Sequence, residues 1–173
     1  MRTRIRTTAL LSVAGLGLTT IAAMGLSSPA QAATNHKCAG VTATIVGTSG
    51  SDEIEGTSGR DVIVGLGGHD EIDGNGGNDL ICGGSGNDEI DGGSGHDRIY
   101  GNAGRDEIDG DSGRDRIWGG SGNDELQGGS GNDRIWGNSG RDLLEGERGK
   151  DKLNGGSGKD RVYQGEEPDR DDD

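Results

Sequence analysis

The stretch GGSGNDEIDGGSGHDRIY, residues 83–100, decides the fold because it presents the same nine-residue unit twice. Each unit reads G-x-x-G-x-D-x-U-x, in which U is a large aliphatic residue. The unit recurs without insertion from Gly47 to Tyr163, which makes thirteen copies. Repetition at such a short fixed period is typical of solenoids, in which each repeat packs only on its neighbours.

The residues within one unit predict its local structure. Glycine at positions 1 and 4 is expected to allow positive φ angles and close approach of the backbone. Position 2 is Gly, Asn, Thr or Asp in most units, which suits a turn. The last three residues are predicted to form a short strand whose central aliphatic side chain points inward. Six residues of turn and three of strand, when stacked, predict an all-β parallel solenoid.

Composition excludes several classes of protein. Glycine accounts for 38 of 173 residues, phenylalanine is absent, and only 27% of the chain is hydrophobic, so a conventional packed core is excluded. The net charge of −14 argues against nucleic acid as a partner. Low hydrophobicity with high charge normally indicates disorder, unless a repeat and a ligand together provide the order.

Position 6 of the unit is the candidate ligand position, because it is aspartate in every copy. Neighbouring strands lie about 4.8 Å apart, so stacking would place these carboxylates in rows that repel one another unless a cation lies between them. Calcium prefers oxygen ligands at about 2.4 Å, and turn carbonyls would complete its shell of oxygens. The candidate ligands are Asp52, Asp61, Asp70, Asp79, Asp88, Asp97, Asp106, Asp115, Asp124, Asp133, Asp142, Asp151 and Asp160.

These units resemble the RTX (repeats-in-toxin) nonapeptide, the hemolysin-type calcium-binding repeat. The resemblance implies a right-handed parallel β-roll with two nonapeptides per 18-residue coil. It also implies calcium ions between turns on the same side, so that Asp52 would share an ion with Asp70. Each ion would lie in a gap between neighbouring turns of one row. Seven turns in one row and six in the other leave six and five gaps, and so at most about eleven ions. Turn carbonyls implied as further ligands include those of Gly83, Ser85, Gly86, Gly92, Ser94, Gly95, Gly119, Ser121, Gly122, Gly128, Ser130 and Gly131.

Two departures from the repeat and one independent pattern refine this reading. Leu66 and Glu147 replace glycine at position 2, and the sites they flank are expected to be weaker. The residues that the motif leaves free alternate between two classes, which an 18-residue coil would sort onto two sheets. At position 7 the two series are Glu53, Glu71, Glu89, Glu107, Glu125 and Val62, Leu80, Arg98, Arg116, Arg134.

One sheet is therefore predicted to have an acidic outer face and the other an arginine-rich face with an aromatic ladder. The ladder has two readings, which the sequence leaves open. It could be a docking strip for a glycan, an anionic polymer or a protein, using stacking and cation–π contacts, or it could only stabilise neighbouring strands. The residues of this face are Arg98, Tyr100, Arg116, Trp118, Arg134 and Trp136.

Residues 1–32 are predicted to be a secretory signal peptide. Three arginines precede a mostly apolar stretch, and Pro29-Ala30-Gln31-Ala32 supplies small residues for cleavage after Ala32. An uncleaved membrane anchor is the alternative, which the glycines and threonines of the apolar stretch weaken. Cleavage leaves a secreted, extracellular chain with a net charge of −17 and no membrane span. Such a signal indicates the general secretory route, as in Gram-positive or actinobacterial proteins.

Segments outside the repeats are short. Residues 33–46 are predicted to be an N-terminal arm, 47–163 the roll, and 164–173 a degenerate cap with an acidic tail. Cys38 and Cys82 are the only cysteines, and export favours a disulfide between them over two free thiols. We expect the Cys38–Val46 arm to cover the apolar outer residues Val62, Val64 and Leu80, with Thr44-Ile45-Val46 in strand phase.

Enzymatic activity is not expected. The arm is too short for an active site, His36, His69 and His96 are isolated, and no H-E-x-x-H zinc motif occurs. One aliphatic residue per nine buries too little surface to offset the entropy of ordering the chain. We therefore expect a secreted calcium-binding protein that folds as it binds the ion. The alternative function is a cell-envelope adhesion or glycan-binding module that uses the arginine and aromatic face.

Overall fold

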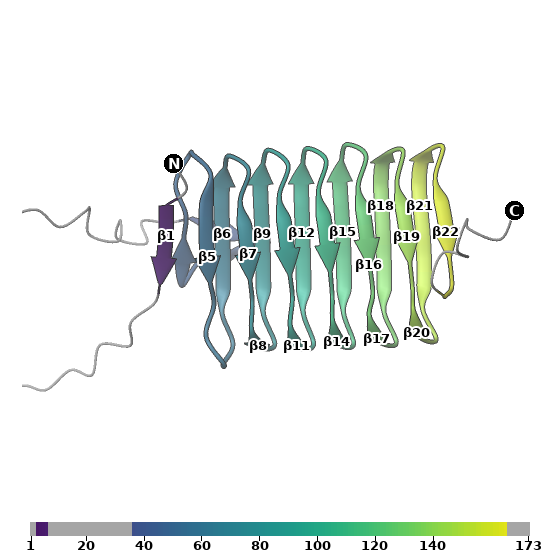
Figure 1. Cartoon of the computed structure of the whole chain (residues 1–173), viewed down its shortest axis with the longest axis horizontal. Helices are drawn as coiled ribbons and strands as arrows, with labels where there is room; N and C mark the ends of the chain where they lie inside the picture. Colours follow the sequence, from purple (N-terminus) through teal and green to yellow (C-terminus); the bar gives the residue numbers. More distant parts are fainter. Residues whose placement is uncertain (1–2, 7–35, 166–173) are drawn as a thin grey trace, which may run out of the picture.

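The computed structural model describes residues 36–165 and the backbone of residues 3–6. This part of the chain is all-β and forms a straight parallel solenoid of stacked coils (Figure 1). None of the described residues belongs to a helix of the length and apolarity needed to cross a membrane. The rest of the predicted signal peptide and the acidic tail from residue 166 lie outside the described residues.

The first large sheet, called sheet 1, contains the short strands of alternate units. All of its neighbours are parallel, and β1 (Thr3–Arg6) adds to its N-terminal edge beside β5. In spatial order its strands are β1, β5 (Asp52–Glu55), β7 (Glu71–Asp73), β10 (Glu89–Asp91), β13 (Glu107–Asp109), β16 (Glu125–Gln127), β19 (Leu143–Glu145) and β22 (Arg161–Tyr163).

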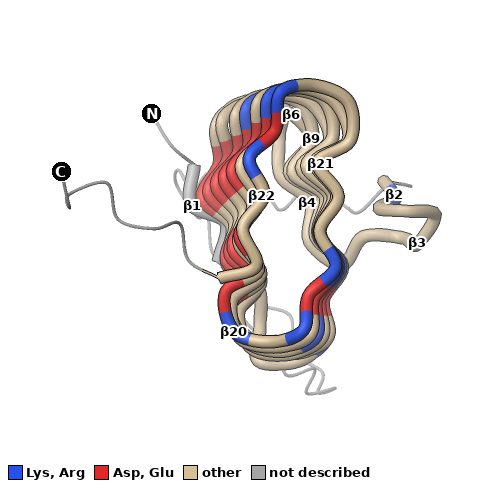
Figure 2. Tube along the Cα trace, turned by 90° about the vertical axis from the view of Figure 1, so that its right-hand side faces the viewer, with Lys and Arg blue, Asp and Glu red and all other residues tan. Residues whose placement is uncertain are grey.

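The second large sheet, sheet 2, contains the strands of the other units and lies on the opposite side of the roll (Figure 2). Its strands are β4 (Ile45–Val46), β6 (Val62–Gly67), β9 (Leu80–Ser85), β12 (Arg98–Ala103), β15 (Arg116–Ser121), β18 (Arg134–Gly140) and β21 (Lys152–Gly158). A third, narrow sheet contains β8 (Gly76–Gly77), β11 (Ser94–Gly95), β14 (Ser112–Gly113), β17 (Ser130–Gly131) and β20 (Arg148–Gly149).

From β5 onward in sheet 1 and from β4 onward in sheet 2, the register between neighbouring coils is 18 residues. Ile90 pairs with Ile108 in sheet 1, and Ile99 pairs with Ile117 in sheet 2. Two nonapeptides therefore make one coil, as predicted. The alternating outer residues are sorted onto two faces, so that Glu89 lies beside Glu107 and Arg98 beside Arg116.

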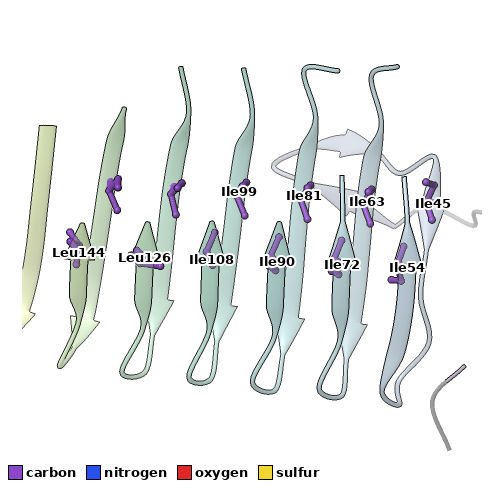
Figure 3. Packing of buried hydrophobic residues seen from close by; sticks show 12 residues of the cluster. Ile45, Ile54, Ile63, Ile72, Ile81, Ile90, Ile99, Ile108, Leu126 and Leu144 are labelled. Atoms are coloured by element: carbon purple, nitrogen blue, oxygen red, sulfur yellow. The ribbon is translucent and has the colours of Figure 1, made fainter. Parts of the chain in front are cut away.

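The core is a double stack of aliphatic side chains between the two large sheets (Figure 3). The first eleven units contribute their position-8 residues, and Ile45 of the arm begins the sheet 2 stack. Most of these side chains are completely buried, whereas Val162 in the last strand remains 45% exposed because no further coil covers it. The buried stack consists of Ile45, Ile54, Ile63, Ile72, Ile81, Ile90, Ile99, Ile108, Ile117, Leu126, Ile135 and Leu144.

Two details of the turns differ from the prediction. The strands of sheet 2 continue into the following turn, and the opposite turns form the narrow third sheet, so the division into six turn and three strand residues describes only sheet 1. Positive φ angles occur at positions 2 and 4, as at Asn102 (77°) and Gly104 (135°), but not at position 1. Glycine is needed at position 1 for space, not for a left-handed backbone.

The N-terminal arm covers the first coils of sheet 2. Strand β4 pairs with β6, and the hairpin of β2 (Lys37–Cys38) and β3 (Val41–Thr42) projects beside this face (Figure 2). A disulfide joins Cys38 to Cys82, 44 residues further along the chain. The arm and the outer face of the first coils together bury the cluster Cys38, Ala43, Val62, Val64 and Leu80.

Candidate metal centre

The position-6 aspartates form two hydrogen-bonded rows, one on each side of the roll. In every gap between coils, the N–H of one aspartate donates to Oδ1 of the aspartate 18 residues later, as Asp88 does to Asp106 at 3.0 Å. All eleven gaps that the thirteen aspartates define contain this bond, at 2.7–3.1 Å. The bond orients each carboxylate toward the preceding coil.

The second carboxylate oxygen, Oδ2, is the unusual feature of these rows. It is buried and has no hydrogen-bond partner in the position-6 aspartates of ten consecutive units, from Asp70 to Asp151. A buried oxygen that lacks both water and a donor is unfavourable, particularly when it carries charge. Repetition of this arrangement along both rows indicates sites suited to a cation and not an isolated defect.

Glycine at position 1 provides the space beside this oxygen. A Cβ atom at Gly83 would lie 2.5 Å from Asp88 Oδ2 and 3.1 Å from the carbonyl oxygen of Gly101 in the next coil. Both oxygens therefore border the same small space. Glycine at position 4 has a similar role, because a Cβ atom at Gly104 would collide with the carbonyl oxygen of Gly86 in the preceding coil.

The predicted carbonyl ligands fall into two groups. In the first group, the carbonyl oxygen of a position-1 or position-4 glycine lies next to a glycine of an adjacent coil. This group consists of the carbonyls of Gly83, Gly86, Gly92, Gly95, Gly119, Gly122, Gly128 and Gly131. At position 3, the carbonyls of Ser85 and Ser121 accept backbone N–H groups of Gly68 and Gly104, at 2.8 and 2.9 Å. The glycine carbonyls are therefore the better candidates for ion ligands.

Burial perturbs the acidity of the row. It raises the pKa of Asp106 and of Asp115 to about 7; the hydrogen bond from the preceding aspartate opposes this shift, and the charges of neighbouring row aspartates add to it. The roll without metal therefore disfavours the charged form of its own ligands. The same cause raises the pKa to about 6 in Asp70, Asp97, Asp124 and Asp133.

These observations fit calcium. Among the described residues, no three His, Cys, Asp or Glu side chains cluster as a metal site, so carboxylates alone cannot complete one. Each gap instead combines a buried Oδ2 that has no hydrogen-bond partner with an aspartate of the neighbouring coil in the same row. The glycines beside the gap have no Cβ atom, which leaves room next to main-chain carbonyl oxygens. A set made only of oxygen, including main-chain carbonyls, suits a hard cation with high coordination number. Calcium would supply the positive charge that both rows lack.

The first aspartate of each row has a different environment, which the sequence analysis missed. Asp52 Oδ2 accepts the N–H and the hydroxyl of Thr48, at 2.6 and 2.9 Å. Asp61 Oδ2 accepts the same two groups of Thr57, at 2.7 and 2.8 Å. Threonine occurs at position 2 only in these two units, and that restriction was the available signal.

Position 5 adds a column of hydrogen bonds outside each row. His69 Nδ1 accepts the N–H of Asn87 at 2.7 Å, and His96 Nδ1 accepts that of Arg114 at 2.9 Å. Both histidines are exposed. Their ring nitrogens connect successive turns, as the asparagine side chains at this position also do.

Comparison with known families agrees with this geometry. The sequence pattern of the RTX calcium-binding nonapeptide repeat (4 copies) matches residues 46–81, 83–117, 109–144, 118–153 and 136–166, which span most of the chain. The chain belongs to this family. No curated protein matches it. RTX calcium-binding repeats in a β-roll imply calcium as the ligand of the two aspartate rows.

The outer face of sheet 2 in this RTX roll carries the predicted aromatic ladder. Tyr100 and Trp118 are stacked with ring centroids 4.4 Å apart and planes within 2°, and Trp118 stacks on Trp136 at 4.8 Å and 6°. The rings therefore cover one another's faces and present mainly their edges outward. Ring stacking on a glycan, one basis of the adhesion hypothesis, is accordingly unavailable along the middle of the ladder.

Proposed function

We propose that this chain is a secreted calcium-binding protein whose roll folds as the ion binds. The observation that carries the proposal is the unbroken series of buried Oδ2 atoms without partners. Each would be a stable ligand only beside a cation, so the ordered roll and the bound metal depend on each other. Folding outside the cell, where calcium is abundant, agrees with the predicted signal peptide and with the disulfide.

The proposed role is non-enzymatic. The metal candidates are repeated, buried and equivalent, whereas a catalytic centre needs one distinctive and accessible constellation. Outside the coils, the described residues add only the arm and β1. The predicted adhesion role loses its stacking component because the rings cover one another. The charge of that face supports a different use.

A calcium titration of residues 33–173 tests the proposal. Circular dichroism should show a coil spectrum in chelator and a β spectrum at millimolar calcium, because extracellular sites bind at about 10⁻⁴–10⁻³ M. Magnesium should not substitute, since it requires tight octahedral geometry and loses water reluctantly. Equal β content with and without calcium would refute coupled folding, and full rescue by magnesium would contradict the proposed site chemistry.

A further inference from the structure

The two outer faces of the roll carry opposite charges in straight columns. On sheet 2, position 7 places cations side by side in successive coils, as Arg98, Arg116, Arg134 and Lys152. On sheet 1, the same position carries Glu71, Glu89, Glu107 and Glu125 in the same coil-by-coil register. Seen along the axis, successive coils lie one behind another, so residues at the same position form a column along the roll (Figure 2).

This arrangement does not help the isolated roll. Like charges directly opposite one another in neighbouring strands are destabilising, whereas alternating charges would stabilise the same sheet. Arg98, Arg116 and Arg134 are exposed, and none of them forms an ion pair within the described residues. On sheet 1, the glutamate column has local compensation, since a guanidinium nitrogen of Arg105 lies 3.9 Å from a carboxylate oxygen of Glu125. The cationic column of sheet 2 is therefore the face that lacks compensating charge.

The partner of the cationic face must present acidic groups along a straight line with the spacing of the coils. Sheet 1 of another molecule meets this condition by construction, because both faces share the repeat of a single solenoid. Its carboxylates line a shallow groove formed by Glu71, Asp73, Glu89, Asp91, Glu107 and Asp109. On sheet 2, Trp118 and Trp136 are half-buried, and their indole N–H groups have no hydrogen-bond partner among the described residues.

We propose that sheet 2 of one molecule docks on sheet 1 of a second copy of this chain, with the Arg98–Arg116–Arg134–Lys152 column against the glutamate column. The arm covers the first two coils of sheet 2, where Val62 and Leu80 replace the cations. The contact is therefore confined to the third to sixth coils. Because the two surfaces differ, a docked pair leaves one face of each kind available to further copies, and the assembly can grow as an open-ended row.

This association depends on calcium and so rests on the proposed function. Without ions, the predicted mature chain has a net charge of −17, and copies repel one another. About nine bound calcium ions would cancel that charge, fewer than the eleven gaps between coils could hold. The attraction between the cationic face of one copy and the acidic face of another then outweighs the repulsion between their net charges. Association should consequently appear only in calcium and weaken with added salt.

Charge reversal on each face tests the proposal. One variant carries R98E, R116E and R134E, and the other carries E71R, E89R and E107R. Each places on one sheet the column that the other sheet carries naturally, so the fold should tolerate it. In calcium, sedimentation should show the wild type growing in mass with concentration, both variants remaining monomeric, and their equimolar mixture associating again.

Two controls separate this proposal from the calcium proposal. Circular dichroism in calcium reports whether the wild type folds. A wild type without β structure in calcium contradicts the calcium proposal. A wild type that folds in calcium but stays monomeric contradicts only the docking proposal. The matched variant R60E/R141E/K159E makes the same change in net charge as R98E/R116E/R134E, at exposed turn residues outside both columns, and should associate like the wild type. Continued association of either face variant alone would also overturn the docking.

An anionic polymer is the competing occupant of sheet 2. Polygalacturonate added in calcium would then bind the monomeric wild type and fail to bind R98E/R116E/R134E. That result, together with absence of association in the mixture of face variants, assigns the surface to a polyanion and overturns docking between copies. If the mixture associates and polygalacturonate competes for the same face, docking between copies stands.

Discussion

The first two coils and the central coils obey different physical rules, although the same nonapeptide builds both. In the first coil, Thr48 and Thr57 satisfy the second oxygens of Asp52 and Asp61, and a covalently attached arm buries an apolar cluster. In the centre, as already at Asp70 and Asp79 of the second coil, each row aspartate leaves Oδ2 without a partner, and no arm covers the charged and aromatic outer face. Ordinary packing therefore supports the N-terminal end, whereas the centre depends on a ligand.

Removal of calcium should have the largest effect on this contrast. In chelator, hydrogen exchange should show the central coils, from about residue 83 onward, without protection, because their row aspartates need the ion. Residues 37–82 should retain measurable protection, since the arm, the disulfide and the apolar cluster do not depend on metal. Uniform loss of protection along the whole chain would show that the end has no independent stability.

Loss of the disulfide should remove the distinct stability of the N-terminal end. A C38S/C82S variant opens a loop with a sequence separation of 44 residues. In the chain-entropy view such a bond contributes about 4 kcal/mol to the free energy of unfolding. Urea unfolding in calcium should show this decrease, and a reduced wild type should match the variant. Unchanged stability in both would mean that packing alone holds the arm.

Removal of one row aspartate should cost more bound ions in the centre of the roll than at its C-terminal end. Asp106→Ala takes a ligand from the gaps shared with Asp88 and Asp124, whereas Asp160→Ala affects only the gap shared with Asp142. Calorimetry should show about two ions lost in the first variant and about one in the second, because each carboxylate borders its neighbouring gaps. Sites such as that of Asp97 and Asp115 lie in the other row and should survive. Equal losses would indicate independent sites within single nonapeptides.

Acidification should partly replace calcium in the central coils. Burial holds the pKa of Asp106 and Asp115 near 7, above the unfolded value of 3.8, so the folded state binds more protons between these limits. The resulting stabilisation is complete below about pH 3.8 and disappears as pH rises through about 7. In chelator, β structure should therefore increase from pH 8 to pH 4. Ellipticity that stays constant over this range would contradict the raised pKa values.

The smallest expected difference concerns position 2 of two unusual units. Leu66 and Glu147 hold φ angles of 80° and 58°, which cost roughly 1 kcal/mol in residues other than glycine. Glu147→Gly should therefore raise the free energy of unfolding in calcium by about 1 kcal/mol. Leu66→Gly should gain less, because Leu66 also packs against the apolar cluster of the first coils. A larger gain at Leu66 would show that this packing contributes little.

Much of the roll follows from the sequence alone. A nine-residue period with one inward aliphatic residue leaves stacking as the only way to bury that residue, and alternation of the outer residues requires an 18-residue coil. The recurrent aspartate predicts rows of like charge, and hence a cation, before any coordinate is known. The two cysteines and the apolar outer residues similarly indicate where the arm must lie.

Tertiary structure alone decided which atoms carry these roles. Position-1 glycines, as at Gly83, prove to be spaces for a carboxylate oxygen and not left-handed turns, because a Cβ atom there would collide with Oδ2 of Asp88 and approach the Gly101 carbonyl of the next coil. Thr48 and Thr57 satisfy their aspartates through contacts that arise only once the turn has closed. The faces of the aromatic ladder, which sequence left open to a ligand, are covered by one another. A repeat specifies its period, but distances between coils exist only after stacking.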